Sequence, residues 1–132
     1  MDKNTKRILI VEDDANFVKV LEDGLSQHGF TQIITAVDGE EGLTKATQEK
    51  PDLILLDLVL PKMRGEDFLK KLREHEDIKA TAVLIVSQLS DYEKISETMS
   101  LGIKGYLVKS DFSLESMISQ IETILSEGEK KS

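Results

Sequence analysis

The sequence contains no cysteine, and only two of its 132 residues are proline. Without cysteine the chain has no disulfide, no zinc–thiolate site and no thiol redox chemistry, which is typical of proteins in a reducing compartment. No apolar run approaches the length of a membrane span, and the N-terminal residues lack the apolar core of a signal peptide. We therefore expect a cytoplasmic protein that does not insert into membranes.

Positive charge is also scarce: the chain has 17 lysines and arginines but 25 acids, for a net charge of -8. An acidic surface repels phosphate backbones, so we expect no direct nucleic-acid partner. The low proline content and a charged fraction of 32% argue against a disordered main body. A chain of this length can bury about two thirds of its unfolded surface as one domain.

Short β-branched or leucine-rich runs alternate five times with segments of helical periodicity, which is typical of βαβ units. The expected strands are about 8–11, 33–36, 53–57, 82–86 and 105–108, and the expected helices about 15–28, 39–49, around 68–72, 90–101 and after 113. Right-handed crossovers then favour an α/β, flavodoxin-like (βα)5 three-layer sandwich. Its parallel sheet has the order 2-1-3-4-5, with helices on both faces.

The pattern predicts a single domain over residues 1–132, with a core of about 7–126. The last residues, 127–132, carry no pattern, and we expect a frayed tail or a linker stub. Asp38 is expected to cap the second helix and Ser113 the fifth. Ser90 opens a Ser-x-x-Glu capping box and is expected to cap the fourth.

Asp57 ends the central strand, at the sheet edge where open parallel sheets bind ligands. The adjacent first strand ends in Glu12, Asp13 and Asp14. Two carboxylates about 4 Å apart repel by roughly 4 kcal/mol at an effective dielectric of 20, so the group favours a proton or a cation. Such oxygen ligands suit Mg²⁺. The structural alternative is that Asp13 and Asp14 only cap the following helix.

Two further strands end in a polar residue, Ser87 after the fourth and Lys109 after the fifth. Each alone is typical of a turn serine or a solvated lysine. Because the carboxyl ends of parallel strands lie at one edge, the four strand ends together predict a single site.

With these motifs the chain resembles bacterial response-regulator receiver domains over about 7–126. The matching segments are Ile-Leu-Ile-Val-Glu-Asp-Asp at 8–14, Pro-Asp-Leu-Ile-Leu-Leu-Asp-Leu-Val-Leu-Pro-Lys-Met-Arg-Gly at 51–65, Ser87, and Gly-Ile-Lys-Gly-Tyr-Leu-Val-Lys at 102–109. The resemblance implies a stand-alone phosphoacceptor switch of a two-component or phosphorelay system, with the receiver part of a larger regulator as the alternative.

The resemblance also implies a role for each residue of the site. Asp57 is the implied phosphoacceptor, and the implied cofactor is Mg²⁺, with Mn²⁺ as a substitute. The implied metal ligands are Glu12, Asp13, Asp57 and the backbone carbonyl of Val59. Ser87 and Lys109 are implied to bind the phosphoryl group, and Tyr106 to turn inward with Ser87 as the switch.

The implied phosphate donor is a histidine kinase or a histidine phosphotransfer protein. Output to a downstream protein target is implied through the fourth helix, the fifth strand and the fifth helix. The same face would serve a weak dimer if the protein is not a monomer. The chain is thus expected to catalyse only its own phosphorylation and dephosphorylation.

Four residues near the implied site differ from the common pattern or modify it. Ser110 stands where many receivers have a proline joined by a cis bond. Because a cis bond costs a non-proline residue about 2.5 to 4 kcal/mol, we expect a trans bond after Lys109. Gln88 is long enough to cover part of the pocket and slow access. Val59 and Leu89 have no group to orient an attacking water, which favours slow self-dephosphorylation.

Three other functions fit parts of the pattern. A phosphatase with Asp57 as nucleophile commonly has a general acid two residues later, where this chain has Val59. A flavodoxin-like cofactor binder would need a phosphate loop rich in glycine or hydroxyls after the first strand, where acids stand instead. A phosphate-independent interaction module with the same fold is the third alternative.

Overall fold

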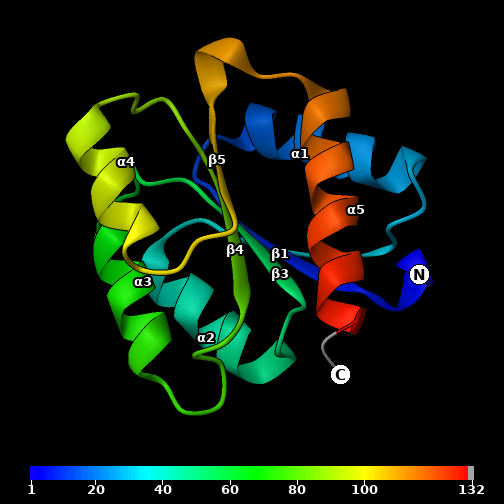
Figure 1. Cartoon of the computed structure of the whole chain (residues 1–132), viewed down its shortest axis with the longest axis horizontal. Coiled ribbons are helices and arrows are strands. Elements are labelled where there is room, and N and C mark those ends of the chain that lie inside the picture. The colour runs from blue at the N-terminus through cyan, green and yellow to red at the C-terminus, as the bar shows by residue number, and fades with distance from the viewer. Residues whose placement is uncertain (131–132) are drawn as a thin grey trace.

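A computed structural model describes residues 1–130 of the chain, in which helices and strands alternate as the sequence predicts (Figure 1). The strands are β1 (Arg7–Val11), β2 (Gln32–Ala36), β3 (Leu53–Leu56), β4 (Ala82–Ser87) and β5 (Gly105–Val108). The helices are α1 (Ala15–Gln27), α2 (Gly39–Glu49), α3 (Gly65–Glu74), α4 (Tyr92–Met99) and α5 (Leu114–Lys130), with short 3-10 helices η1 (Lys3–Thr5) and η2 (Lys109–Asp111). All strand pairs are parallel, and the predicted order β2-β1-β3-β4-β5 is confirmed.

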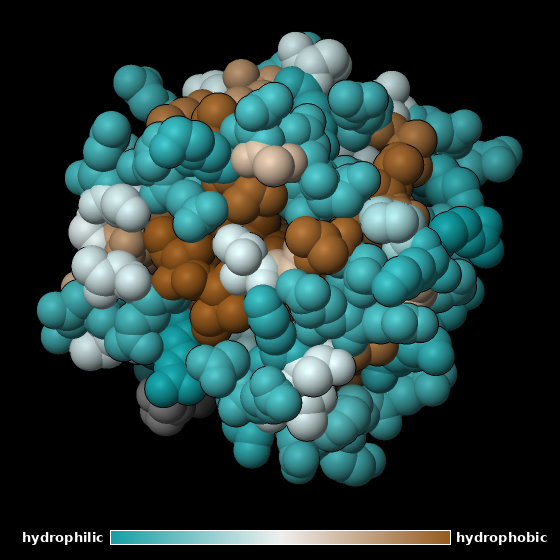
Figure 2. Space-filling model, turned by 180° about the vertical axis from the view of Figure 1, so that it is seen from behind, coloured by the Kyte–Doolittle hydropathy of each residue, from teal (hydrophilic) through white to brown (hydrophobic). Residues whose placement is uncertain are grey.

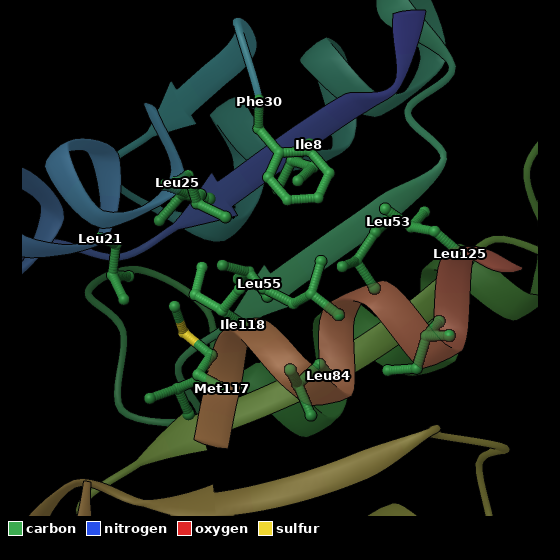
Figure 3. Packing of buried hydrophobic residues seen from close by; sticks show 14 residues of the cluster. Ile8, Leu21, Leu25, Phe30, Leu53, Leu55, Leu84, Met117, Ile118 and Leu125 are labelled. Atoms are coloured by element: carbon green, nitrogen blue, oxygen red, sulfur yellow. The ribbon is translucent and has the colours of Figure 1, made fainter. Parts of the chain in front are cut away.

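Helices cover both faces of the sheet, with α1 and α5 on one side and α2, α3 and α4 on the other (Figure 1). On the first side, the apolar stripes of α1 and α5 pack onto β1, β3 and β4 in one cluster, which includes Phe30 (Figure 3). On the second side, Phe68, Leu69 and Leu72 of α3 pack against the other face of the sheet. Because both faces are covered, every residue of β3 is buried, as a continuous apolar run predicts.

The strand register brings the predicted site residues to one edge of the sheet. Val11 pairs with Leu56, so the next residues, Glu12 and Asp57, leave the sheet side by side. On the other side of β3, Ser87 at the end of β4 pairs with Val108, the residue before Lys109.

The helix boundaries agree with the expected caps at two positions and disagree at a third. Asp38 accepts a hydrogen bond from the Glu41 amide at 2.8 Å, and Ser113 accepts one from the Ser116 amide at 3.2 Å. The expectation that Ser90 caps α4 was wrong. The cap is Asp91, which lies next to Ser90 and accepts from the Glu93 amide at 2.8 Å.

Residues 127–130, expected to belong to a frayed tail or a linker stub, continue α5 to Lys130. Residues 131–132 lie outside the described part of the chain. The helix continues because its first turns pack their apolar stripe onto the sheet, and propagation from a formed helix adds a backbone hydrogen bond per residue.

The surface is mostly hydrophilic, with a group of hydrophobic side chains near the middle of the face seen from behind (Figure 2). β2 forms the sheet edge remote from β5, and its central residues are half-buried. In residues 1–130 no helix combines the length and the apolar character that crossing a membrane requires.

Candidate functional site

Three acids meet where β1 and β3 end. Glu12 and Asp13 follow β1 and Asp57 follows β3, and one carboxylate oxygen from each lies within 4.8 Å of the others. Glu12 and Asp57 are 3% and 5% exposed, whereas Asp13 faces solvent. The predicted acidic cluster is therefore formed, by residues that are far apart in the sequence.

The capping role that the sequence left open belongs to Asp14. Its carboxylate accepts hydrogen bonds from the Asn16 and Phe17 amides at 3.0 and 3.2 Å, at the start of α1. The Asp14 amide itself donates to Glu12 Oε2 at 3.1 Å. Helix capping thus accounts for Asp14 and leaves Glu12 and Asp13 to the acidic cluster.

Lys109 reaches into this cluster from the end of β5. Its Nζ lies 2.6 Å from Glu12 Oε1 and 3.2 Å from Asp57 Oδ2, and its side chain is 12% exposed. Burial alone would lower the pKa of Lys109, but the hydrogen bond to Glu12 and the charges of both acids outweigh it and raise the pKa. Residues 1–130 contain no cis peptide, which confirms the trans bond expected between Lys109 and Ser110.

Glu12 is the acid whose charge is most affected by its surroundings. Burial raises its pKa to about 7, and the charge of Asp57 acts in the same direction. The hydrogen bonds from Lys109 and from the Asp14 amide lower the pKa and offset part of this effect. A carboxyl group in this position favours a proton or an added cation near neutral pH.

The cluster opens into a pocket of about 220 Å³. It is lined by Glu12, Asp13, Asp14, Asp57, Val59, Gln88 and Lys109. The Val59 amide donates to Asp57 Oδ1 at 3.1 Å, which fixes that carboxylate from the loop side. Carboxylates and a nearby backbone carbonyl are the ligands that Mg²⁺ prefers, so the donor set fits this ion.

The loop after Asp57 is held tightly against α3. The Gly65 amide donates to the Leu58 carbonyl at 2.9 Å. A β-carbon at Gly65 would lie 2.5 Å from Leu58 Cα and 2.9 Å from the carbonyl oxygen of Asp57. Only glycine permits this approach without moving the backbone that carries the acid.

Ser87, Leu89 and Tyr106 form a separate network beside the pocket. Ser87 is fully buried, and its Oγ accepts a hydrogen bond from the Leu89 amide at 3.3 Å. The Tyr106 hydroxyl donates to the Leu89 carbonyl at 2.6 Å. Burial raises the pKa of Tyr106, while Ser87 offsets part of this rise. Leu89, expected to flank the pocket, instead packs against the apolar cluster between the sheet and α3.

No sequence pattern indicates that an aromatic ring lies beside the Lys109 ammonium. The Nζ of Lys109 lies 4.5 Å from the centre of the Phe17 ring. Phe17 in turn makes an edge contact with Phe112, with ring centres 5.3 Å apart and planes at 70°. No local motif connects Phe17 to Lys109.

Comparison with known proteins agrees with this geometry. The family model described as "Response regulator receiver domain" matches residues 8–122. The "Alkaline phosphatase synthesis transcriptional regulatory protein PhoP" of Bacillus subtilis is 36% identical over 124 residues, which are 94% of this chain and 50% of that protein. The "Probable chemotaxis protein CheY" of Rhizobium etli is 34% identical over 118 residues, or 89% of this chain and 91% of that protein.

Solved structures have the same fold. A CheY-like response regulator receiver domain protein from Methanospirillum hungatei superposes with a TM-score of 0.87 at 28% identity, covering 96% of this chain and 98% of that one. The chain spans about half the length of several curated relatives that it matches. On the family match, the strand order and the acidic pocket, the chain belongs to the response regulator receiver domain family, the regulatory phosphoacceptor domains of two-component signalling.

Proposed function

We propose that the protein is a Mg²⁺-dependent signalling switch in which Asp57 accepts a phosphoryl group from a phosphohistidine. The donor is a histidine kinase or a histidine phosphotransfer protein, in the cytoplasm. One observation carries the proposal. The Asp57 carboxylate belongs to an acidic cluster, lies 3.2 Å from the Lys109 ammonium and lines an open pocket.

The transfer forms one bond and breaks one bond. A carboxylate oxygen of Asp57 forms an O–P bond as the P–N bond to the donor imidazole breaks, and the bonding electron pair goes to that nitrogen. With the second ring nitrogen already protonated, the imidazole leaves neutral. Attack of an anion on an anion needs positive charge in place beforehand, which Lys109 supplies beside Asp57.

Glu12, Asp13, Asp57 and the Val59 carbonyl are the proposed holders of Mg²⁺, with Mn²⁺ as a substitute. The raised pKa of Glu12 supports this assignment, because a bound cation offsets the unfavourable burial of its charge. When bound, the ion neutralises the charge that builds up on the phosphoryl oxygens. The Val59 amide keeps Asp57 oriented through its hydrogen bond to Oδ1.

The network of Ser87, Leu89 and Tyr106 is the proposed link from the pocket to the output surface. A phosphoryl oxygen on Asp57 would accept a hydrogen bond from the Ser87 hydroxyl, whose oxygen already accepts one from the Leu89 amide, so Ser87 would pull this loop toward the pocket. Because the Leu89 carbonyl also holds the Tyr106 hydroxyl, any movement of this loop changes the position of Tyr106 on β5. The proposed output face is α4, β5 and α5, which contacts a target protein or a second copy in a weak dimer.

Gln88 and Val59 are the proposed regulators of access. Both line the pocket, and neither offers an ionisable group to activate a water. The phosphoryl group on Asp57 is therefore expected to be long-lived. Loss of radiolabel from purified phosphoprotein at neutral pH measures its lifetime, and a half-life of seconds would contradict this expectation.

The test of the proposed function is phosphorylation by acetyl phosphate or by a panel of phosphorylated kinases, each with Mg²⁺. Wild type is expected to incorporate label, and Asp57→Asn is expected to incorporate none. Asp52→Asn is the matched control, because Asp52 lies at the opposite end of the same strand and is exposed. Equal labelling of wild type and Asp57→Asn would remove Asp57 from its role.

A further inference from the structure

The Phe17 ring contacts the Lys109 ammonium in the pocket, in addition to packing against the hydrophobic core. Its ring is half-buried in the first turn of α1, and the Lys109 Nζ lies 4.5 Å from the ring centre. Within about 6 Å, an ammonium over an aromatic face is attracted by the negative charge of the π-system. Lys109 therefore has three partners: the carboxylates of Glu12 and Asp57 and the ring of Phe17.

The ring is itself fixed by the segment that carries Lys109. Phe112 directly follows η2, which begins at Lys109, and the Phe17 and Phe112 rings pack edge to face at 5.3 Å. Such edge-to-face pairs are favourable aromatic geometries. The contact between the two rings thus joins the first turn of α1 to the loop after β5, and Phe17 also contacts the ammonium.

We propose that Phe17 is a positioning residue for phosphoryl transfer: the face of its ring holds the Lys109 ammonium in the pocket while the carboxylate partners of that ammonium change. This inference rests on the proposed function of Asp57.

The change of partners follows from the contacts of Lys109. Before transfer, its Nζ lies 2.6 Å from Glu12 Oε1 and 3.2 Å from Asp57 Oδ2, with the centre of the Phe17 ring 4.5 Å away. Once Asp57 carries a phosphoryl group, it is an acyl phosphate and no longer a charged carboxylate, so this partner of the ammonium is replaced by the charge of the phosphoryl oxygens. A lysine side chain has a flexible four-carbon stem, so an ammonium that loses one anion can swing into water.

An aromatic ring is suited to hold the ammonium during this exchange. It bears no ionisable group, so its attraction does not depend on which carboxylate is occupied. It also has no directional lone pair, and the ammonium can shift over its face without losing the contact. Phe17 would thereby keep the positive charge near the phosphoryl group before and after transfer.

A second lysine–phenylalanine pair provides an internal comparison. Lys3 Nζ lies 5.4 Å from the centre of the Phe30 ring, but neither residue lines the acidic pocket. Phe30→Leu therefore removes a ring beside a lysine without touching the site, and it reports the effect of general core loosening.

The experiment compares initial rates of labelling by acetyl phosphate with Mg²⁺ in wild type, Phe17→Leu, Phe17→Trp and Phe30→Leu. Phe17→Leu is expected to be slower by between about 3-fold and about 30-fold, the range of a cation–π contact. Phe17→Trp is expected to retain the wild-type rate, since tryptophan binds cations best. Phe30→Leu is expected to retain it as well, with thermal unfolding recorded for each variant.

A variant with unchanged shape separates charge attraction from packing. Incorporation of 3,4,5-trifluorophenylalanine at position 17 withdraws electrons from the ring face and should slow labelling as Phe17→Leu does. In the unphosphorylated protein, the ε-methylene protons of Lys109 should show an upfield ring-current shift in NMR spectra, which Phe17→Leu removes.

The outcomes separate the two claims. No labelling of wild type by acetyl phosphate or by any of the phosphorylated kinases overturns the proposed function and this inference together. Labelling of wild type but not of Asp57→Asn, with an unchanged rate in Phe17→Leu or in the trifluorinated protein, overturns the role of Phe17 alone.

Discussion

At the scale of single residues, Glu12 is the group whose titration is expected to make the pocket sensitive to pH. It is 3% exposed, lies 2.6 Å from Lys109 Nζ, and has a pKa raised to about 7 by burial. The ordinary value for this carboxyl group is 4.5. Between these two values the folded protein binds a proton that the unfolded chain releases, so this group's contribution to stability decreases as pH rises through that window.

The same shift predicts how Mg²⁺ affinity depends on pH. As a proposed ligand, Glu12 would bind the ion only in its ionised form, so affinity should rise as pH increases toward about 7 and level off above it. One pH unit below the pKa only about a tenth of the group is ionised, so affinity at pH 6 should be roughly tenfold below the plateau. Isothermal titration calorimetry from pH 5.5 to about pH 8.5 measures this.

Glu12→Gln is the control for this prediction. The variant should bind Mg²⁺ more weakly than wild type and with a flatter pH profile. Equal wild-type affinities at pH 6 and at pH 8 would show that Glu12 does not contribute a titrating ligand.

At the scale of elements, the start of α3 sets the position of Asp57. Gly65→Ala would place a β-carbon 2.5 Å from the Leu58 backbone, which cannot turn aside as a side chain can. We expect a loss of about 1 to 3 kcal/mol in the free energy of unfolding and slower labelling of Asp57. Urea unfolding and acetyl phosphate labelling measure the two effects.

Gly128→Ala is the matched control for Gly65→Ala. Gly128 lies in α5, and a β-carbon there would have no atom within 4 Å. Alanine favours the helix over glycine by up to about 1 kcal/mol, so this variant should be as stable as wild type or more so. Destabilisation of both variants to the same extent would exclude the tight approach at Gly65 as the cause.

The cap of α4 gives a second prediction for elements. Asp91→Ala removes the acceptor of the Glu93 amide and should cost about 1 kcal/mol, whereas Ser90→Ala should cost little. α4 has eight residues, so the loss should appear as faster amide hydrogen exchange throughout that helix. A larger loss of stability in Ser90→Ala than in Asp91→Ala would show that Ser90 is the cap.

At the scale of the whole molecule, Arg73 joins three parts of the fold. From α3 its guanidinium donates to the carbonyls of Lys79 and Thr81, which lead into β4, at 3.0 and 2.7 Å. It also donates to those of Leu101 and Gly102, which lie between α4 and β5, at 2.9 and 3.2 Å. Burial lowers the pKa of Arg73 from its ordinary value.

Arg73→Lys should destabilise the protein by roughly 1 to 3 kcal/mol, because a lysine cannot reach carbonyls on both sides as a planar guanidinium does. Arg64→Lys is the control, since Arg64 is exposed and 3.6 Å from Asp67. The urea midpoints of the two variants measure the difference. Coincident midpoints would show that the carbonyls find other partners, such as water.

The sequence predicted the strand order and the pocket acids because both follow from local patterns. Five apolar runs with helical segments between them define a parallel sheet, and polar residues at the ends of its strands must share an edge. The sequence did not predict the cap of α4, because Ser90 and Asp91 are adjacent and both suit the position. Nor did the sequence predict that α5 continues through residues 127–130, since these residues have no apolar pattern.

By itself, then, the sequence determined the sheet, the identity of the acids at its edge and the likeness to receiver domains, since each depends on residue order and spacing. Only the tertiary structure decided how those groups act on one another. The raised pKa of Glu12 comes from burial by other elements, and the Phe17 ring reaches Lys109 because α1 and the loop after β5 pack together. Burial and contact between distant segments are properties of the packed chain, and no local pattern encodes them.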